Sequence, residues 1–133
     1  MSKYIKDISG ETPDIETYLY VKDYISKYQL NIDINSKPLK DQIIEVDTLL
    51  KFHDNSESKK KSHFEITYST VIKLNKEIKD KNILQKIVLC DVQKEVYPEI
   101  EKALLNLLHT SGYPEIKFEK KVDFEELYKK NFN

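Results

Sequence analysis

The residue types that carry out chemistry in enzymes are present in this chain but are not grouped. The three histidines, His53, His63 and His109, lack the short spacing of metal ligands, although His53 and His63 flank one loop. Gly10 and Gly112 are the only glycines, too few for a phosphate-binding loop. We therefore expect a protein that is not an enzyme and that holds no metal and no cofactor.

The single cysteine offers no reactive site either. Cys90 follows the apolar residues 87–89, which indicates a buried thiol of low reactivity. With one cysteine, no disulfide can form within the chain.

Large apolar and aromatic side chains are more informative than the titratable ones. The chain has 9 Tyr and 5 Phe, and a tyrosine ring supplies a large contact area at a low entropic cost. These side chains suit a binding protein. Our candidates for an apolar groove that holds an unfolded peptide are Ile15, Tyr18, Leu19, Tyr20, Ile78, Ile83 and Leu84. For each of them, membership of an ordinary core is the alternative.

Length and charge restrict the class further. A chain of 133 residues is expected to form one domain, residues 1–133. A net charge of −1 argues against a nucleic-acid partner, and we interpret the three lysines at 59–61 as a solvated turn. No stretch approaches the roughly 20 apolar residues of a membrane span, and the N-terminus lacks a signal-peptide pattern. We expect a cytoplasmic protein without membrane insertion.

Alternation of apolar and polar residues predicts four strands. They cover residues 3–8, 28–34, 42–53 and 62–74. Gly10 and Pro13 are expected to end the first strand, and residues 35–40 to turn the chain after the second. The segment 14–27 fits a helix or an extended segment equally well.

Helical periodicity replaces alternation after the fourth strand. A helix is expected over residues 78–88, with a possible break near 80–82. Asp91 is the expected cap of a longer helix that ends at Gly112 and contains Pro98, which is expected to kink it.

The C-terminal residues predict one more helix. Asp123 and Glu126 form a capping pair, and Phe124, Leu127 and Phe132 supply its apolar side. The expected fold class is α+β: a four-stranded antiparallel sheet packed with helices, with a long Pro-interrupted helix in the C-terminal part.

Two blocks of this sequence resemble the SecB family of export chaperones. The first is Tyr4-Ile-Lys-Asp-Ile-Ser-Gly-Glu-Thr-Pro13, a strand that runs into a Glu-x-Pro stop. The second covers residues 90–132 and contains in order Cys90, Pro98, Gly112-Tyr113-Pro114 and Val122-Asp123-Phe124. The resemblance covers nearly the whole chain.

The resemblance implies a holdase chaperone that works without ATP. SecB-like proteins hold unfolded preproteins in apolar grooves and deliver them to the SecA translocation motor. They assemble as homotetramers, dimers of dimers, in which the first strand and the long helix make subunit contacts. By this resemblance the oligomer interface would include Tyr4, Ile8, Val96 and Ile100.

The resemblance also implies a docking site for the motor. Acidic residues of the family correspond here to Asp7, Glu11 and Glu65. Strand alternation places Asp7 and Glu65 on the face opposite to Phe64. The leucine two residues before the last of these acids in familiar sequences is replaced by His63. A solvated charge at a strand edge is the alternative for each acid.

The net charge departs from the usual family pattern. Export chaperones of this type are strongly acidic, whereas this chain is near neutral, which allows a different partner. SecB-like chaperones dedicated to the antitoxin of a toxin-antitoxin system are the alternative that the sequence leaves open.

Overall fold

The computed structural model describes residues 1–56, 58–76, 78–114, 116 and 123–132. Its strands are β1 (Ser2–Glu11), β2 (Gln29–Pro38), β3 (Ile43–His53) and β4 (His63–Lys73). Its helices are α1 (Ile15–Tyr24), α2 (Lys81–Lys86), α3 (Val92–Thr110) and α4 (Phe124–Phe132). A 3₁₀ turn, Ile25–Lys27, follows α1, and a π-helical turn, Ile87–Asp91, joins α2 to α3.

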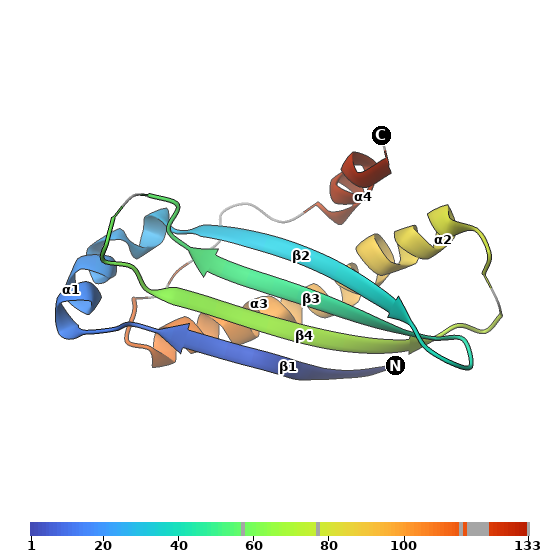
Figure 1. Ribbon diagram of the computed structural model, residues 1–133, viewed down its shortest axis with the longest axis horizontal. Coiled ribbons are helices and arrows are strands. Elements are labelled where there is room, and N and C mark those ends of the chain that lie inside the picture. Colours follow the sequence, from blue (N-terminus) through green and yellow to red (C-terminus); the bar gives the residue numbers. More distant parts are fainter. Residues whose placement is uncertain (57, 77, 115, 117–122, 133) are drawn as a thin grey trace.

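The four strands form one antiparallel sheet in the order β1-β4-β3-β2. In Figure 1, α3 lies behind this sheet, α1 stands at one end of it and α2 at the other. We call the face that packs on α3 the inner face and the opposite one the outer face. The arrangement confirms the predicted α+β class and the antiparallel sheet.

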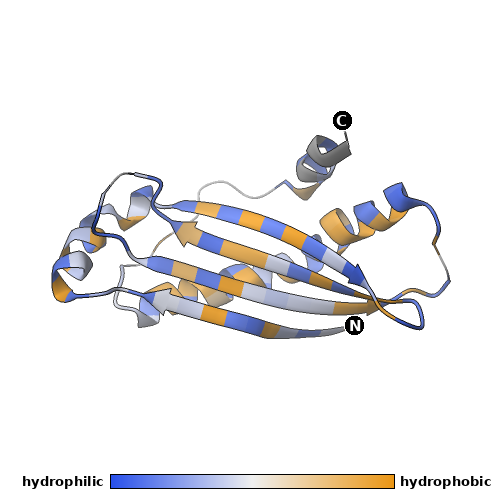
Figure 2. Cartoon of the chain, in the orientation of Figure 1, coloured by the Kyte–Doolittle hydropathy of each residue, from blue (hydrophilic) through white to orange (hydrophobic). Residues whose placement is uncertain are grey.

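Alternation along the strands explains why one face is covered. Figure 2 shows apolar and polar residues alternating along β2 and β3. In β3, Val46 and Leu50 are fully buried on the inner face, while Asp47 between them points to the outer face. They share a core with Ile100 and Leu104 of α3, both also fully buried. The period of two in the strands and the apolar stripe of α3 therefore meet in one layer.

Two predicted strand ends are wrong. β1 continues through Gly10, which pairs with Phe64 of β4. A Cβ at Gly10 would lie 3.0 Å from the Phe64 ring, so the glycine permits this close approach and does not end the strand. β2 extends to Pro38, and the reversal comes later, where Asp41 and Gln42 both have positive φ, 63° and 61°. Two central residues at positive φ are typical of a type I′ hairpin turn.

The segment that fitted a helix or an extended segment is a helix. The Asp14 side chain accepts a hydrogen bond of 2.7 Å from the Thr17 amide, and this cap begins α1. Asp91, in contrast, makes no side-chain capping bond, because the chain is already helical there. The expected cap at Asp91 is therefore wrong.

Pro98 lies inside α3, as predicted, and α3 continues on both sides of it. An interruption at Pro98 is not shown. The irregular turn lies earlier, at residues 87–91, where the hydrogen bonding changes to the π pattern.

The predicted end of α3 at Gly112 and the predicted start of α4 at Asp123 are confirmed. Gly112 ends α3 with φ of 95°, while the Tyr113 amide bonds to the Leu108 carbonyl at 3.1 Å, as in a Schellman motif. Asp123 Oδ1 accepts hydrogen bonds from the amides of Glu125 and Glu126 and begins α4. The expected packing of Leu127 and Phe132 lies outside the described side chains.

Candidate functional site

The three predicted docking acids lie on the outer face of the sheet. The register pairs Asp7 with Thr67 and Glu11 with His63, while Glu65 follows two residues after His63 along β4. Directly paired residues of an antiparallel ladder share a face, so all three carboxylates project from the side opposite to Phe64. The sheet thus brings Glu65 to the same face as two acids that lie more than fifty positions earlier in the sequence.

These acids differ in how they are engaged. A carboxylate oxygen of Glu65 lies 3.0 Å from His63 Nε2 and 3.8 Å from Lys51 Nζ. Within the described residues, the side-chain carboxylates of Asp7 and Glu11 have neither an ion-pair partner nor a hydrogen-bond partner. Two of the three carboxylates are thus free to meet a cationic partner.

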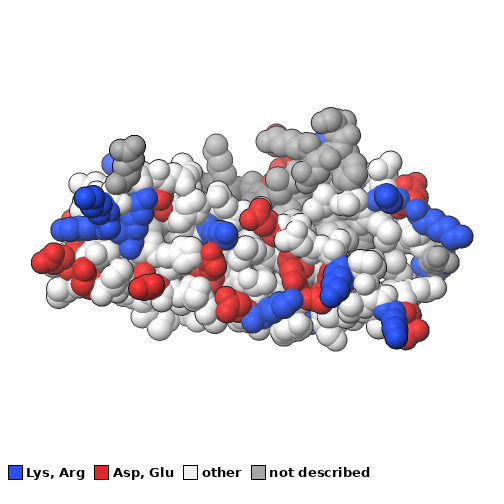
Figure 3. Space-filling view, in the orientation of Figure 1, with Lys and Arg blue, Asp and Glu red and all other residues white. Residues whose placement is uncertain are grey.

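A bulge in β1 adds a cation to the same face. The register shifts between Ile5 and Asp7, and Lys6 reaches across β4 to Glu45 Oε1 at 2.8 Å and to Asp47 Oδ2 at 2.9 Å. These hydrogen bonds raise the pKa of Lys6 above its usual value. Although partial burial works against the charged form, the hydrogen bond from Lys6 holds the pKa of Asp47 below its usual range. Figure 3 shows acidic side chains spread over this face with lysines between them.

The first set of groove candidates lies on α1 and is mostly exposed. Ile15 is 72% exposed and Leu19 57%, one helical turn apart, with Tyr20 also exposed beside them. Tyr18 differs, because its hydroxyl donates to the Gly112 carbonyl at 2.7 Å and its ring lies 5.4 Å from that of Tyr113. α1 therefore presents an apolar ridge and is held to the end of α3 by Tyr18.

The second set lies at the opposite end of the sheet, around α2 (Figure 1). Ile83 is exposed, while Ile78 and Leu84 are half-buried. Leu84 also lines a cavity of about 320 Å³ between α2 and the sheet. Its lining consists of Ser36, Pro38, Ile44, Lys81, Leu84, Gln85 and Val88. Because the two sets occupy opposite ends, one chain does not bring them into a single groove.

The predicted interface residues divide into two groups. Tyr4 and Ile8 are exposed on β1, whose ten residues are all exposed and which pairs with another described strand only on its β4 side. Ile5 is equally exposed there, and sequence reasoning missed it. Val96 and Ile100 are fully buried beneath the sheet, so they offer no surface to a second chain. The intramolecular core accounts for both.

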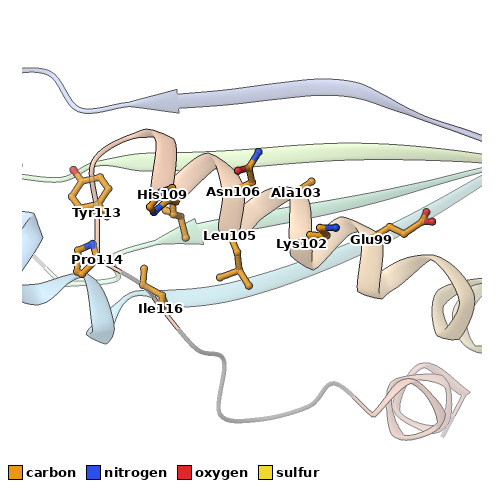
Figure 4. A pocket seen from close by; sticks show the side chains of 10 residues that line it. Glu99, Lys102, Ala103, Leu105, Asn106, His109, Tyr113, Pro114 and Ile116 are labelled. Carbon is orange, nitrogen blue, oxygen red and sulfur yellow. The ribbon is translucent and has the colours of Figure 1, made fainter.

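Sequence reasoning also missed a hollow beside α3. It has a volume of about 860 Å³, and Figure 4 shows side chains from α3 and those of Tyr113, Pro114 and Ile116 around it. The apolar part of its wall includes Leu105, Pro114 and Ile116, and the polar part includes Lys102 and His109. Half-buried Leu105 could have pointed to it, since it lies off the main apolar stripe of the helix.

Several other features concern chemistry. Cys90 is buried, as predicted. Burial raises the pKa of Tyr97, which lies under α4, to about 12. Among the described residues, no group of His, Cys, Asp and Glu side chains is arranged to hold a metal ion. No helix in the same part of the chain is long and apolar enough to cross a membrane.

Comparison with known proteins assigns the chain to a family. The family model described as preprotein translocase subunit SecB matches residues 1–133. The chain belongs to the SecB family. It is 56% identical over 133 residues to the putative protein-export protein SecB of Pelagibacter ubique (strain HTCC1062), covering all of this chain and 95% of that protein. The protein-export protein SecB of Bartonella quintana (strain Toulouse) is 23% identical, with 98% and 80% covered.

A solved SecB-like structure supports the fold independently. It is a Mycobacterium tuberculosis SecB-like chaperone in complex with a ChAD peptide from the HigA1 antitoxin. The TM-score is 0.53 at 11% identity, with 91% of this chain and 88% of that chain covered. The chain is accordingly a SecB-type chaperone of the protein-transport class, and its fold is that of SecB-like chaperones.

Proposed function

We propose that this SecB-type chaperone is an ATP-independent holdase that binds unfolded preproteins and delivers them to the SecA motor in the cytoplasm. The observation that carries the proposal is the match of the SecB family model along all 133 residues. No catalytic residue and no cofactor has a part in this mechanism. We assign motor docking to the outer face, client binding to the apolar surfaces on α1 and α2, and assembly to the edge of β1.

The outer face docks the motor. Asp7, Glu11 and Glu65 share this face, and two of them lack a partner among the described residues. Exposed carboxylates on one face favour a partner with a basic surface, because charge complementarity sets association rate and partner choice. His63 and Lys51 partly neutralise Glu65, so Asp7 and Glu11 supply most of the unpaired negative charge.

The apolar surfaces on α1 and α2, at the two ends of the sheet, hold the client. Ile15, Leu19 and Tyr20 form a ridge on α1, and Ile83 with Leu84 forms the second apolar surface at α2. Exposed side chains of this size are unusual on a chain that works alone. An unfolded polypeptide supplies the apolar partners that each surface lacks, and no nucleotide energy is needed for such burial.

Assembly uses the free edge of β1. Within the described part of the chain, this edge pairs with no second strand, and its inner side carries the exposed Ile5 and Ile8. Long exposed edges with apolar side chains are usually covered. A second copy of the chain covers this edge in a dimer, and two dimers form the homotetramer.

A dedicated antitoxin chaperone is the second candidate. The SecB-like structure of similar fold was solved with an antitoxin peptide. An export chaperone binds many clients, whereas a dedicated chaperone binds one. The second candidate would be favoured if a toxin and antitoxin gene pair lies beside this gene and the protein binds only that antitoxin.

The test is suppression of aggregation. A chemically unfolded client is diluted with and without a stoichiometric amount of this protein, and light scattering is followed without ATP. We expect suppression, together with a tetrameric mass from size exclusion with light scattering. A chain that leaves scattering unchanged, or that stays monomeric at micromolar concentration, would contradict the holdase or the assembly, respectively.

Matched variants assign the client surface. Ile15→Asp together with Leu19→Asp adds two negative charges to α1 and removes the exposed ridge, so suppression should weaken. Lys22→Glu changes the charge of α1 by the same amount at another exposed position and should leave suppression intact. Equal effects of both variants would mean that charge, not the ridge, decides client binding.

A further inference from the structure

Three buried or half-buried hydroxyls meet where β1 and β4 come to their shared end. The Tyr113 hydroxyl lies 2.6 Å from Ser62 Oγ and 2.7 Å from Thr12 Oγ1, and the last two atoms are 2.8 Å apart. Three hydroxyls at these distances can each donate to the next in a closed ring. We call Thr12, Ser62 and Tyr113 the hydroxyl ring.

The hydroxyl ring adjoins the docking acids in the sequence. Thr12 follows Glu11 directly, and Ser62 precedes His63, the residue that pairs with Glu11 in the final rung of the β1–β4 ladder. Glu65 is two residues further along β4. The hydroxyl ring therefore joins the ends of β1 and β4 immediately beyond the rung that carries Glu11.

This end of β1 needs such a restraint. In a single chain all ten residues of β1 are exposed, and its last rung lies at the end of the edge strand. Strand ends with few buried contacts open most easily. A separated end would move Glu11 away from Glu65 without unfolding the core.

Tyr113 is fixed from three further directions. Its ring meets Phe64 edge-on at 5.6 Å and packs on Tyr18 at 5.4 Å. The Schellman turn at Gly112 sets its backbone, and it is only 2% exposed. A rigid group of this kind can hold the end of an edge strand in place.

We propose that Tyr113 is a positioning residue for motor docking: through the hydroxyl ring it fixes Glu11 beside Glu65 on the outer face. The inference rests on the proposed docking of SecA. It assigns a role to a residue that lies beneath the outer face and touches no partner itself.

The test separates docking from stability with matched variants. Tyr113→Phe removes only the tyrosine hydroxyl, which is one of the three hydroxyls of the hydroxyl ring. Tyr68→Phe removes another tyrosine hydroxyl of similar setting, which donates to Glu99 of α3 at 3.2 Å, away from the ring. For each variant, thermal unfolding is measured first, and affinity for purified SecA and suppression of aggregation are then measured at a temperature where all variants are folded.

We expect Tyr113→Phe to weaken SecA binding by about three- to tenfold, the range that one hydrogen bond is worth. Suppression of aggregation should stay at the wild-type level, and Tyr68→Phe should bind SecA like the wild type. Thr12→Val, which removes a second hydroxyl of the ring, should weaken binding similarly, and the double variant should add little.

Equal SecA affinity of Tyr113→Phe and the wild type would overturn the inference, as would equal losses in Tyr113→Phe and Tyr68→Phe. A wild-type protein that does not bind SecA at all would instead overturn the proposed docking, so the two failures are distinguishable.

Discussion

The two faces of the sheet are made by the same strands yet differ in what they do. On the inner face, Val46, Leu50, Phe64 and Ile66 are almost completely buried. On the outer face, neighbouring positions of the same strands carry Asp47, Glu65 and Lys51 in ion pairs or in water. The difference leads us to expect that the inward residues set stability and that the outward residues, as proposed, set partner choice, so each can be changed without the other.

The largest expected effect is on the inner face. Leu104 of α3 is fully buried in the core, so Leu104→Ala should lower the free energy of unfolding by about 2–5 kcal/mol. Leu19→Ala on exposed α1 is the control for the same change and should cost far less. Denaturant unfolding measures both. Similar losses at the two positions would break the contrast between buried and exposed leucines.

A smaller effect is expected from the buried polar pair beneath the sheet. Gln93 and Thr48 are fully buried, and Gln93 Nε2 donates to Thr48 Oγ1 at 2.8 Å. Gln93→Leu leaves the hydroxyl unpaired and should cost about 1–3 kcal/mol, whereas adding Thr48→Val should recover most of the loss. If the double variant loses as much stability as the two single variants added together, the broken hydrogen bond between the two side chains is not the cause of the loss.

Charge reversal on the outer face should hardly change stability. Asp7 and Glu65 lie at partly or fully exposed positions, so Asp7→Lys with Glu65→Lys should shift the unfolding free energy by no more than about 0.5 kcal/mol each. Thermal unfolding measures this. A loss as large as that of Leu104→Ala would mean that the outer face also holds the fold together.

The smallest expected effect concerns pH and the cap of α1. The hydrogen bond from the Thr17 amide holds the pKa of Asp14 below its usual value. A lowered folded pKa stabilises the fold above the unfolded value of about 4, and this contribution is lost as pH falls through the folded pKa. Asparagine caps helices without titrating, so Asp14→Asn should lose less stability between neutral and acidic pH. Identical pH profiles of the two proteins would contradict this cap.

Most of the sheet was predictable because alternation reports burial directly. The pattern from Ile44 to Phe52 shows which side chains lie inward, and the structure agrees. The end of β2 was not predictable from residues 35–38, because their polar composition is typical of a turn. The turn itself lies at Asp41 and Gln42, which have positive φ.

The candidate site was predictable in parts. Strand alternation placed Asp7 and Glu65 on one face, the family resemblance added Glu11, and the β1–β4 register puts all three on that face. The burial of Val96 and Ile100 was not evident, because an apolar helical stripe has the same pattern whether it meets its own sheet or a second chain. The hydroxyl ring joins residues up to 101 positions apart, a separation that no local pattern reveals.

The most direct test of the account is the affinity of SecA for the variant Asp7→Lys with Glu65→Lys, titrated at moderate salt beside an aggregation assay. The control Asp23→Lys with Glu95→Lys carries the same change in net charge at exposed acids of α1 and α3, which lie off the outer face. We predict at least about tenfold weaker binding for the docking variant only, the scale of lost charge complementarity, with aggregation still suppressed. Unchanged SecA affinity, or equal losses in both double variants, would contradict the assignment of the outer face as the docking surface.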